Sequence, residues 1–242
     1  MEKTIYLCID DTDTEASIGT GRVARHLAEE IQKKNYGKIE GITRHQLLLD
    51  KRVPYTSNNG NACLKITDFD EKIYELSVEF MKANFVPGSD PGICICPESL
   101  ITSEVVNFGH MAQQKVLSKN EAYELAHKKN IFLKELGGDG QGVIGALAGV
   151  GLRFSGNDGR FIELDNIRNV VNKMKVKEIL ERTPIESVVD LQGNELSEEV
   201  VIEPLGWLRP CLRNGKPVLI VGGPIAKGIE GNLEGVYIPV KL

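Results

Sequence analysis

Aromatic residues and long apolar runs are scarce in this sequence. Only 6% of its 242 residues are aromatic, and a single tryptophan occurs. No stretch approaches the roughly 18 apolar residues that a membrane-spanning helix needs, and the first residues, MEKTIYLCID, lack the basic-then-apolar order of a signal peptide. We therefore expect a cytoplasmic protein without a membrane partner. Its hydrophobic content of 41% is sufficient for a globular core.

Cysteine pairs with the spacing of a zinc ribbon are also absent. Such a ribbon needs two CxxC-type pairs. The chain has five cysteines, an odd number, and the two that lie close together, Cys94 and Cys96, are separated by one residue. We therefore expect free, buried thiols and no structural zinc.

Basic residues do not predominate. The chain has 29 lysine and arginine residues against 34 acidic ones, which gives a formal net charge of −5. Proteins that bind nucleic acid through their whole surface carry an excess of basic residues. The composition therefore does not indicate a polyanion partner, although a local basic patch stays open.

Apolar periodicity predicts strands and helices in alternation along the first 155 residues, which is typical of an α/β fold. A glycine run at 137–142 opens a segment of small residues, 143–150, that we expect to pack closely against another element. The strands are expected at residues 4–9, 39–49, 62–66 and 92–96, with an uncertain one at 131–136, and the helices at 20–34, 71–85 and 120–129.

A second, smaller α+β unit is expected after the glycine-containing stretch 155–159. We therefore place a domain boundary between residues 155 and 156, which gives domains at 1–155 and 156–242. In the second domain, a helix is expected at 166–182 and strands at 161–164, 188–191, 200–203, 218–221 and 236–240.

Three aspartates, Asp10, Asp11 and Asp13, follow the first predicted strand and precede a helix. Carboxylates this close repel one another unless a cation neutralises them, and Mg²⁺ suits a short loop with one or two carboxylates, waters and phosphate oxygens. The alternative is a polar turn that caps the helix, with Ser17 or Thr20 as the capping residue.

Two glycine-containing segments are candidates for phosphate binding. Thr20 and Arg22 bring a hydroxyl and a cation to the first turn of a helix, where the helix dipole favours anions, although Thr20 could equally act as a cap. In the later run, Gly140, Gln141 and Gly142 could contact phosphate or ribose through backbone N–H groups. The pattern Gly140-x-Gly142-x-x-Gly145 also fits a dinucleotide fingerprint, but the preceding strand is uncertain. A Walker A loop is excluded, because Val143 stands where that motif needs lysine.

Several motifs occur in the same order as in one known family. They are Ile9-Asp10-Asp11-Thr12-Asp13, Thr20 at a helix start, Val53-Pro54-Tyr55-Thr56, Asn59-Gly60-Asn61-Ala62, Pro91-Gly92 and the segment Gly140-x-Gly142-Val143-Ile144-Gly145-Ala146-Leu147-Ala148. Together they resemble the archaeal synthetase that makes agmatidine in the anticodon of isoleucine tRNA. The resemblance covers roughly residues 1–155.

The resemblance implies an ATP-dependent enzyme whose kinase-like ATP-binding domain has a ferredoxin-like neighbour. It implies that Asp10, Asp11 and Asp13 hold Mg²⁺ and ATP, and that Thr20 matches a phosphorylated threonine. It also implies that Asn59, Asn61 and the Gly140–Gly142 region of this chain lie near the bound nucleotide. Gly19 and Gly21 replace the family's neighbours of this threonine, and the sequence does not include the family's OB-fold and zinc ribbon, which grip tRNA.

We therefore expect an ATP- and Mg²⁺-dependent phosphoryl-transfer or ligase-like enzyme with a kinase-like α/β domain followed by a small ferredoxin-like α+β unit. Its catalytic residues are predicted to be Asp10, Asp11, Asp13 and Thr20. Its acceptor is expected to be a small molecule or a nucleotide-like group, with tRNA possible but not favoured. The alternatives are a tRNA-modifying enzyme that works with an RNA-binding partner and a nucleotide-binding regulator without turnover.

Overall fold

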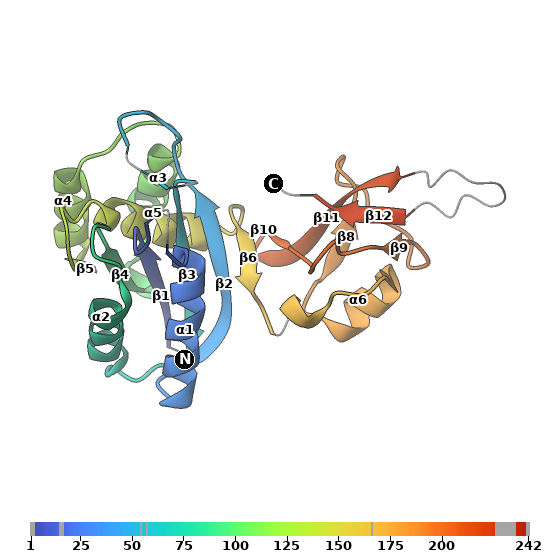
Figure 1. Ribbon diagram of the computed structural model, residues 1–242, viewed down its shortest axis with the longest axis horizontal. Coiled ribbons are helices and arrows are strands. Elements are labelled where there is room, and N and C mark those ends of the chain that lie inside the picture. Colours follow the sequence, from blue (N-terminus) through green and yellow to red (C-terminus); the bar gives the residue numbers. More distant parts are fainter. Residues whose placement is uncertain are drawn as a thin grey trace. The chain divides into compact units, whose positions relative to one another are not determined.

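The chain folds into two compact units, Met1–Ser155 and Gly156–Leu242 (Figure 1). The computed structural model describes residues 3–14, 17–53, 55–56, 58–165, 167–225 and 236–240. Both units combine helices with mostly antiparallel strands, so the fold is of the mixed α/β type. Among the described residues, none of the helices has the length and apolar character needed to cross a membrane.

The N-terminal unit is built on a five-stranded antiparallel sheet. Its strands are β1 (Thr4–Asp10), β2 (Lys38–Gln46), β3 (Gly60–Thr67), β4 (Gly92–Pro97) and β5 (Phe132–Glu135), in the order β5-β4-β1-β3-β2. The central strand β1 places Cys8 opposite Cys63 on one side and opposite Cys94 on the other. The uncertain strand near residues 131–136 is thus confirmed as an edge strand paired with β4.

Helices cover both faces of this sheet. Alternate residues of β1 point to opposite faces, and Tyr6 and Cys8 share one buried cluster with residues of α3 (Ser103–Ala112), α4 (Lys119–Lys129) and α5 (Gly142–Ser155). The other face, with Ile5, Leu7 and Ile9, is left to α1 (Thr20–Lys33) and α2 (Ile73–Asn84), which pack against each other. The predicted helices at 20–34, 71–85 and 120–129 are confirmed, whereas α3 was not predicted.

The first four strands of this unit follow the order β1-α1-β2-β3-α2-β4, with β1 and β3 at the centre of the sheet. This βαββαβ order with antiparallel neighbours is the ferredoxin-like arrangement. A ferredoxin-like unit was expected at residues 156–242 instead. The described residues there contain one α-helix, α6 (Val176–Arg182), and so do not show that order.

The close packing expected of the small-residue segment after the glycine run is confirmed. That segment lies in α5, which contacts β1, β3 and β4. A Cβ atom added at Gly149 would lie 2.3 Å from Cys8 Sγ. Glycines on this side of α5 thus let its backbone approach the centre of the sheet, and the end of β1 comes close to the start of α5.

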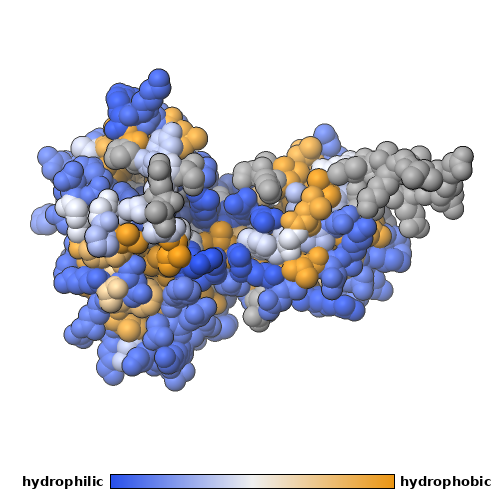
Figure 2. Space-filling model, viewed as in Figure 1, coloured by the Kyte–Doolittle hydropathy of each residue, from blue (hydrophilic) through white to orange (hydrophobic). Residues whose placement is uncertain are grey.

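In the C-terminal unit, strands and the helix α6 surround a second core. Phe161, Ile179, Leu208 and Leu219 are among its buried residues. Figure 2 shows the hydropathy of one face of the surface. In the described part, the strand order is β6-β10-β11-β12-β9-β7, and β8 pairs with β11. The strands are β6 (Arg160–Glu163), β7 (Met174–Lys175), β8 (Ser187–Val189), β9 (Val201–Ile202), β10 (Cys211–Arg213), β11 (Lys216–Ile225) and β12 (Val236–Pro239).

The long helix predicted at 166–182 is wrong in its first half. Asn166 lies outside the described residues, a short 3-10 turn covers Ile167–Asn169, and the α-helix spans only Val176–Arg182. Asparagine and β-branched residues at 169–172 have low helix propensity. The helix begins where Glu178 Oε2 accepts a hydrogen bond from the Lys175 backbone N–H at 2.9 Å, so the cap and not the apolar stripe sets the helix start.

Candidate functional site

The three predicted aspartates gather at the C-terminal end of β1. Asp10 is the last residue of the strand, and Asp11 has a left-handed backbone with φ of 52°, which turns the chain toward α1. Asp10, Asp11, Asp13 and Thr20 all line a cavity of about 300 Å³ in the N-terminal unit. This volume is at the lower end of the range for ligand sites.

Asp13 holds the start of α1 in place. Its Oδ1 atom accepts hydrogen bonds from the Thr20 hydroxyl at 2.6 Å and from the Thr20 backbone N–H at 3.1 Å. The N-cap position is Gly19, so the expectation that Ser17 or Thr20 caps the helix is wrong. Ser17 instead exchanges hydrogen bonds with the backbone of Thr14. Asp13 thus provides the hydrogen-bond acceptor that a capping side chain would otherwise provide at the start of the helix. The Thr20 hydroxyl points at this carboxylate in the cavity wall.

Asp10 is enclosed between β1 and α5. Its residue is only 9% exposed, and a Cβ atom on Gly145 of α5 would lie 1.7 Å from Asp10 Oδ2. Burial, and after it the nearby charge of Asp11, raises the pKa of Asp10 to about 8. A carboxylate in this position is costly to ionise unless a cation lies beside it.

Asp11 shares this electrostatic strain. Burial, with added repulsion from Asp90 and Asp13, raises its pKa to about 6. Asp90 and Asp139 also line the cavity, so five carboxylates face it. Only two cationic side chains, Arg52 and Lys115, belong to the described lining. The excess of negative charge favours a bound cation.

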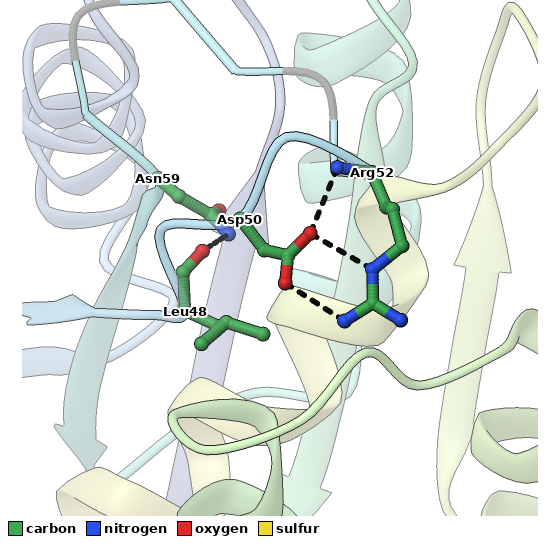
Figure 3. Close-up of polar contacts among 4 residues, drawn as sticks. All are labelled: Leu48, Asp50, Arg52 and Asn59. Carbon is green, nitrogen blue, oxygen red and sulfur yellow. Dashed lines mark hydrogen bonds and ion pairs between the residues drawn. The ribbon is translucent and has the colours of Figure 1, made fainter.

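The loop between β2 and β3 forms another wall of the cavity. At the base of this loop, Asn59 Nδ2 donates a hydrogen bond to the Leu48 carbonyl oxygen at 2.7 Å (Figure 3). Arg52 forms a two-pronged pair with Asp50, with Nε to Oδ1 at 2.9 Å and a second nitrogen to Oδ2 at 2.8 Å. The hydrogen bonds from Arg52 hold the pKa of Asp50 below its ordinary value. Pro54 of this loop lies outside the described residues.

The remaining predicted residues separate into two groups. Asn59, Gln141 and Gly142 line the cavity, whereas Arg22, Asn61 and Gly140 do not belong to its lining. Arg22 lies on α1, away from that lining. Asn61 is fully buried, and its Nδ2 donates a hydrogen bond to the Gly145 carbonyl at 2.8 Å, so it ties β3 to α5.

Four charged lining residues were not predicted as site residues: Arg52, Asp90, Lys115 and Asp139. A signal was present for two of them, because Asp90 directly precedes the Pro91-Gly92 motif and Asp139 lies within the glycine run. Lys115 follows α3, a helix that the sequence pattern did not reveal. Arg52 occurs in a loop whose position over the cavity depends on the pairing of β2 with β3.

The donor set fits a cation that arrives with its own ligands. Among the described residues, no group of three histidine, cysteine or acidic side chains is clustered closely enough to hold a metal alone. Mg²⁺ needs only one or two carboxylates when waters and phosphate oxygens complete its shell. The helices α1 and α5 both begin at the cavity, at Thr20 and Gly142, and their dipoles favour anions there. The N–H groups of Gly142 and Val143 already bond to carbonyls of Asp90 and Gly140, so α5 would contribute its dipole more than free donors.

Solved structures that resemble this chain are of enzymes named for tRNA. No family model and no curated protein matches the sequence. Three solved structures match with 25% identity: a tRNA fluorescent labelling enzyme (TM-score 0.54), apo TiaS, an agmatidine synthetase of isoleucine tRNA (0.53), and a complex of TiaS with its tRNA and ATP (0.55). The matches cover 61%, 61% and 62% of this chain.

The chain spans about a third of the length of these proteins, with 36%, 35% and 36% of each covered. The resemblance to agmatidine synthetase that the motifs indicated is thereby confirmed at the level of structure. The chain contains a TiaS-like core.

Proposed function

We propose that the chain is an ATP- and Mg²⁺-dependent phosphoryl-transfer or ligase-like enzyme that modifies an RNA, with the cavity at the end of β1 as its active site. The observation that carries the proposal is the burial of Asp10 and Asp11 beside further carboxylates, in a cavity where two helices begin. One of the matching structures was solved with both ATP and tRNA, which supports the same ligands here.

The acidic, cationic and apolar residues of the cavity would have different roles. Asp10, Asp11 and Asp13 would hold Mg²⁺, which neutralises the charge that develops on a transferring phosphoryl group. Arg52 and Lys115, as the cations of the lining, would bind phosphate oxygens. The Thr20 hydroxyl donates a hydrogen bond to Asp13 Oδ1 at 2.6 Å, which orients the hydroxyl oxygen. If Thr20 is itself phosphorylated, Asp13 would accept the hydroxyl proton. The apolar residues of the lining, among them Leu47, Leu48 and Ile144, would contact the base of a bound nucleotide.

The kinase-like assignment of the N-terminal unit stays part of this proposal, because the acidic loop and the glycine run both reach the cavity. We do not retain the ferredoxin-like assignment for residues 156–242. The preference for an acceptor other than tRNA is given up as well, because it rested on overall charge and the matching structures are of enzymes named for tRNA.

The test is calorimetric titration of ATP in the presence of Mg²⁺ or EDTA, followed by an ATP-consumption assay with and without tRNA. We expect binding that requires the metal and turnover that rises with tRNA. In Asp11→Asn, metal-dependent binding should be lost while the fold is kept, because the substitution preserves the side-chain shape and removes the charge. Undiminished Mg²⁺-ATP affinity in Asp11→Asn would exclude this site. Binding of ATP without any turnover would favour the alternative of a regulator.

A further inference from the structure

The only tryptophan of the chain, Trp207, is in contact with two arginines in the C-terminal unit. The guanidinium carbons of Arg168 and Arg209 are 4.4 and 4.7 Å from the centre of its ring. Both distances are within the range of cation–π contacts. Arg168 comes from the 3-10 turn after β6, and Arg209 from the loop before β10, so the cluster joins two separate segments of the unit.

These two arginines differ from the lysines around them. Each described lysine of this unit forms an ion pair, and so does Arg182; the pairs are Lys173–Glu203, Lys175–Glu199, Lys177–Glu181, Arg182–Glu178 and Lys216–Glu186. Arg168 and Arg209 pair with no carboxylate of the described residues, and they donate hydrogen bonds to the carbonyl oxygens of Ile162 and Trp207. Burial, and after it the charge of Arg168, lowers the pKa of Arg209.

The loop that carries Trp207 is held firmly at both ends. Glu203 N–H donates to the Tyr237 carbonyl at 2.9 Å, and Phe161 N–H donates to the Pro210 carbonyl at 2.8 Å. Leu208 is fully buried between them. Leu205 has a φ of 47° and is 59% exposed. Residues other than glycine, asparagine and aspartate seldom adopt this left-handed backbone conformation. Hydrogen bonds therefore anchor the loop on both sides of Trp207, and the backbone of Leu205 is strained.

We infer that Trp207, Arg168 and Arg209 form a binding site for an unpaired RNA strand. A guanidinium stacked on an indole keeps its N–H edge available for bidentate contact with phosphate, and its outer face can stack on a base. Single-stranded RNA offers both groups side by side, whereas a duplex hides the base faces. The binding requires no ATP. It adds a second RNA contact to the proposed function, and the two can fail separately.

The test uses the intrinsic tryptophan fluorescence of the full chain, because Trp207 is its only tryptophan. A short single-stranded RNA should quench Trp207, and a duplex of the same length should quench it much less. Labelled RNA in an anisotropy titration, without ATP or Mg²⁺, should bind about tenfold more weakly to the double variant Arg168→Gln/Arg209→Gln, on the scale of lost phosphate and stacking contacts. The matched control is Arg182→Gln, which removes a cation that is already ion-paired and should change the affinity by less than about threefold.

Each other outcome overturns the inference. If the double variant melts at a lower temperature but keeps its RNA affinity, the arginines only clamp the tryptophan. An equal loss in Arg182→Gln would mean a general effect of charge. Full competition by AMP would mean that the site takes free nucleotides and not a strand. Loss of ATP binding in Asp11→Asn, or its persistence, bears on none of these results, because the RNA titration contains no ATP.

Discussion

Gly145 tests the geometry of the acidic site without changing any charge. In Gly145→Ala, the new Cβ would lie 1.7 Å from Asp10 Oδ2 and 3.0 Å from Leu47 Cδ1. An ordinary contact needs about twice the first distance, so the carboxylate must move by more than about 1 Å. Overpacking of this kind costs about 1–3 kcal/mol, and the gain in helix propensity of about 1 kcal/mol offsets part of it. The protein should therefore stay folded with a displaced Asp10.

A displaced carboxylate should weaken Mg²⁺-ATP binding by at least about tenfold, because metal ligation depends on its position. The matched control is Gly109→Ala in α3, whose new Cβ would lie 2.8 Å from the Ala148 carbonyl and 2.9 Å from Leu152 Cγ, both outside the cavity lining. It should lose comparable stability in urea unfolding and keep its ATP affinity by calorimetry. Equal affinities in the two variants would refute the placement of Asp10 in the site.

Three further predictions follow from the same cavity. Thr20→Ser should keep ATP turnover and Thr20→Ala should lose it, with mass spectrometry after ATP treatment as the direct test; unchanged turnover in Thr20→Ala would reduce the role of the hydroxyl to its hydrogen bond with Asp13, at about 1 kcal/mol. Arg52→Gln should lower ATP affinity several-fold in calorimetry, whereas Arg22→Gln should not, because Arg22 is outside the lining. Between pH ~4 and ~8 the unfolded chain releases the Asp10 proton before the folded chain does, so without Mg²⁺ the free energy of unfolding should fall as the pH rises. Urea unfolding at about pH 5 and about pH 8 should show that Asp10→Asn reduces this fall, and an equal fall in the variant would contradict the raised pKa.

The parts of the fold that the sequence predicted are those with strong local signals. The strand 4–9 and the helix 20–34 have clear periodicity, and both occur within one residue of their expected bounds. The helix expected at 166–182 failed because apolar spacing alone cannot show where capping begins a helix. The order of strands in the sheet was beyond local signals as well, since β1 pairs with β3 and β4 through contacts between residues about 55 to 90 positions apart.

The candidate site shows the same division. The aspartate loop was visible as a sequence motif, because its residues are contiguous. Arg52, Asp90 and Lys115 reach the cavity only through the pairing of β2 with β3, the end of β4 and the packing of α3. Asn61 was predicted near the nucleotide because of its neighbours in a motif, and in the structure its side chain donates a hydrogen bond to the Gly145 carbonyl. A motif thus identifies which residues belong together, but the tertiary structure decides which of them face the ligand.

The burial of Asp10 depends on the glycine at position 145 of α5. With alanine at position 145, the Asp10 carboxylate would have to move away from the helix, and with better solvation its pKa would be closer to the ordinary value. With glycine there, the helix approaches closely enough to bury Asp10 and raise its pKa to about 8. The close packing of α5 is therefore what makes the carboxylate unfavourable when ionised and unpaired. A cation that enters the cavity relieves this cost, so the same packing that destabilises the empty site favours binding of Mg²⁺ with a nucleotide.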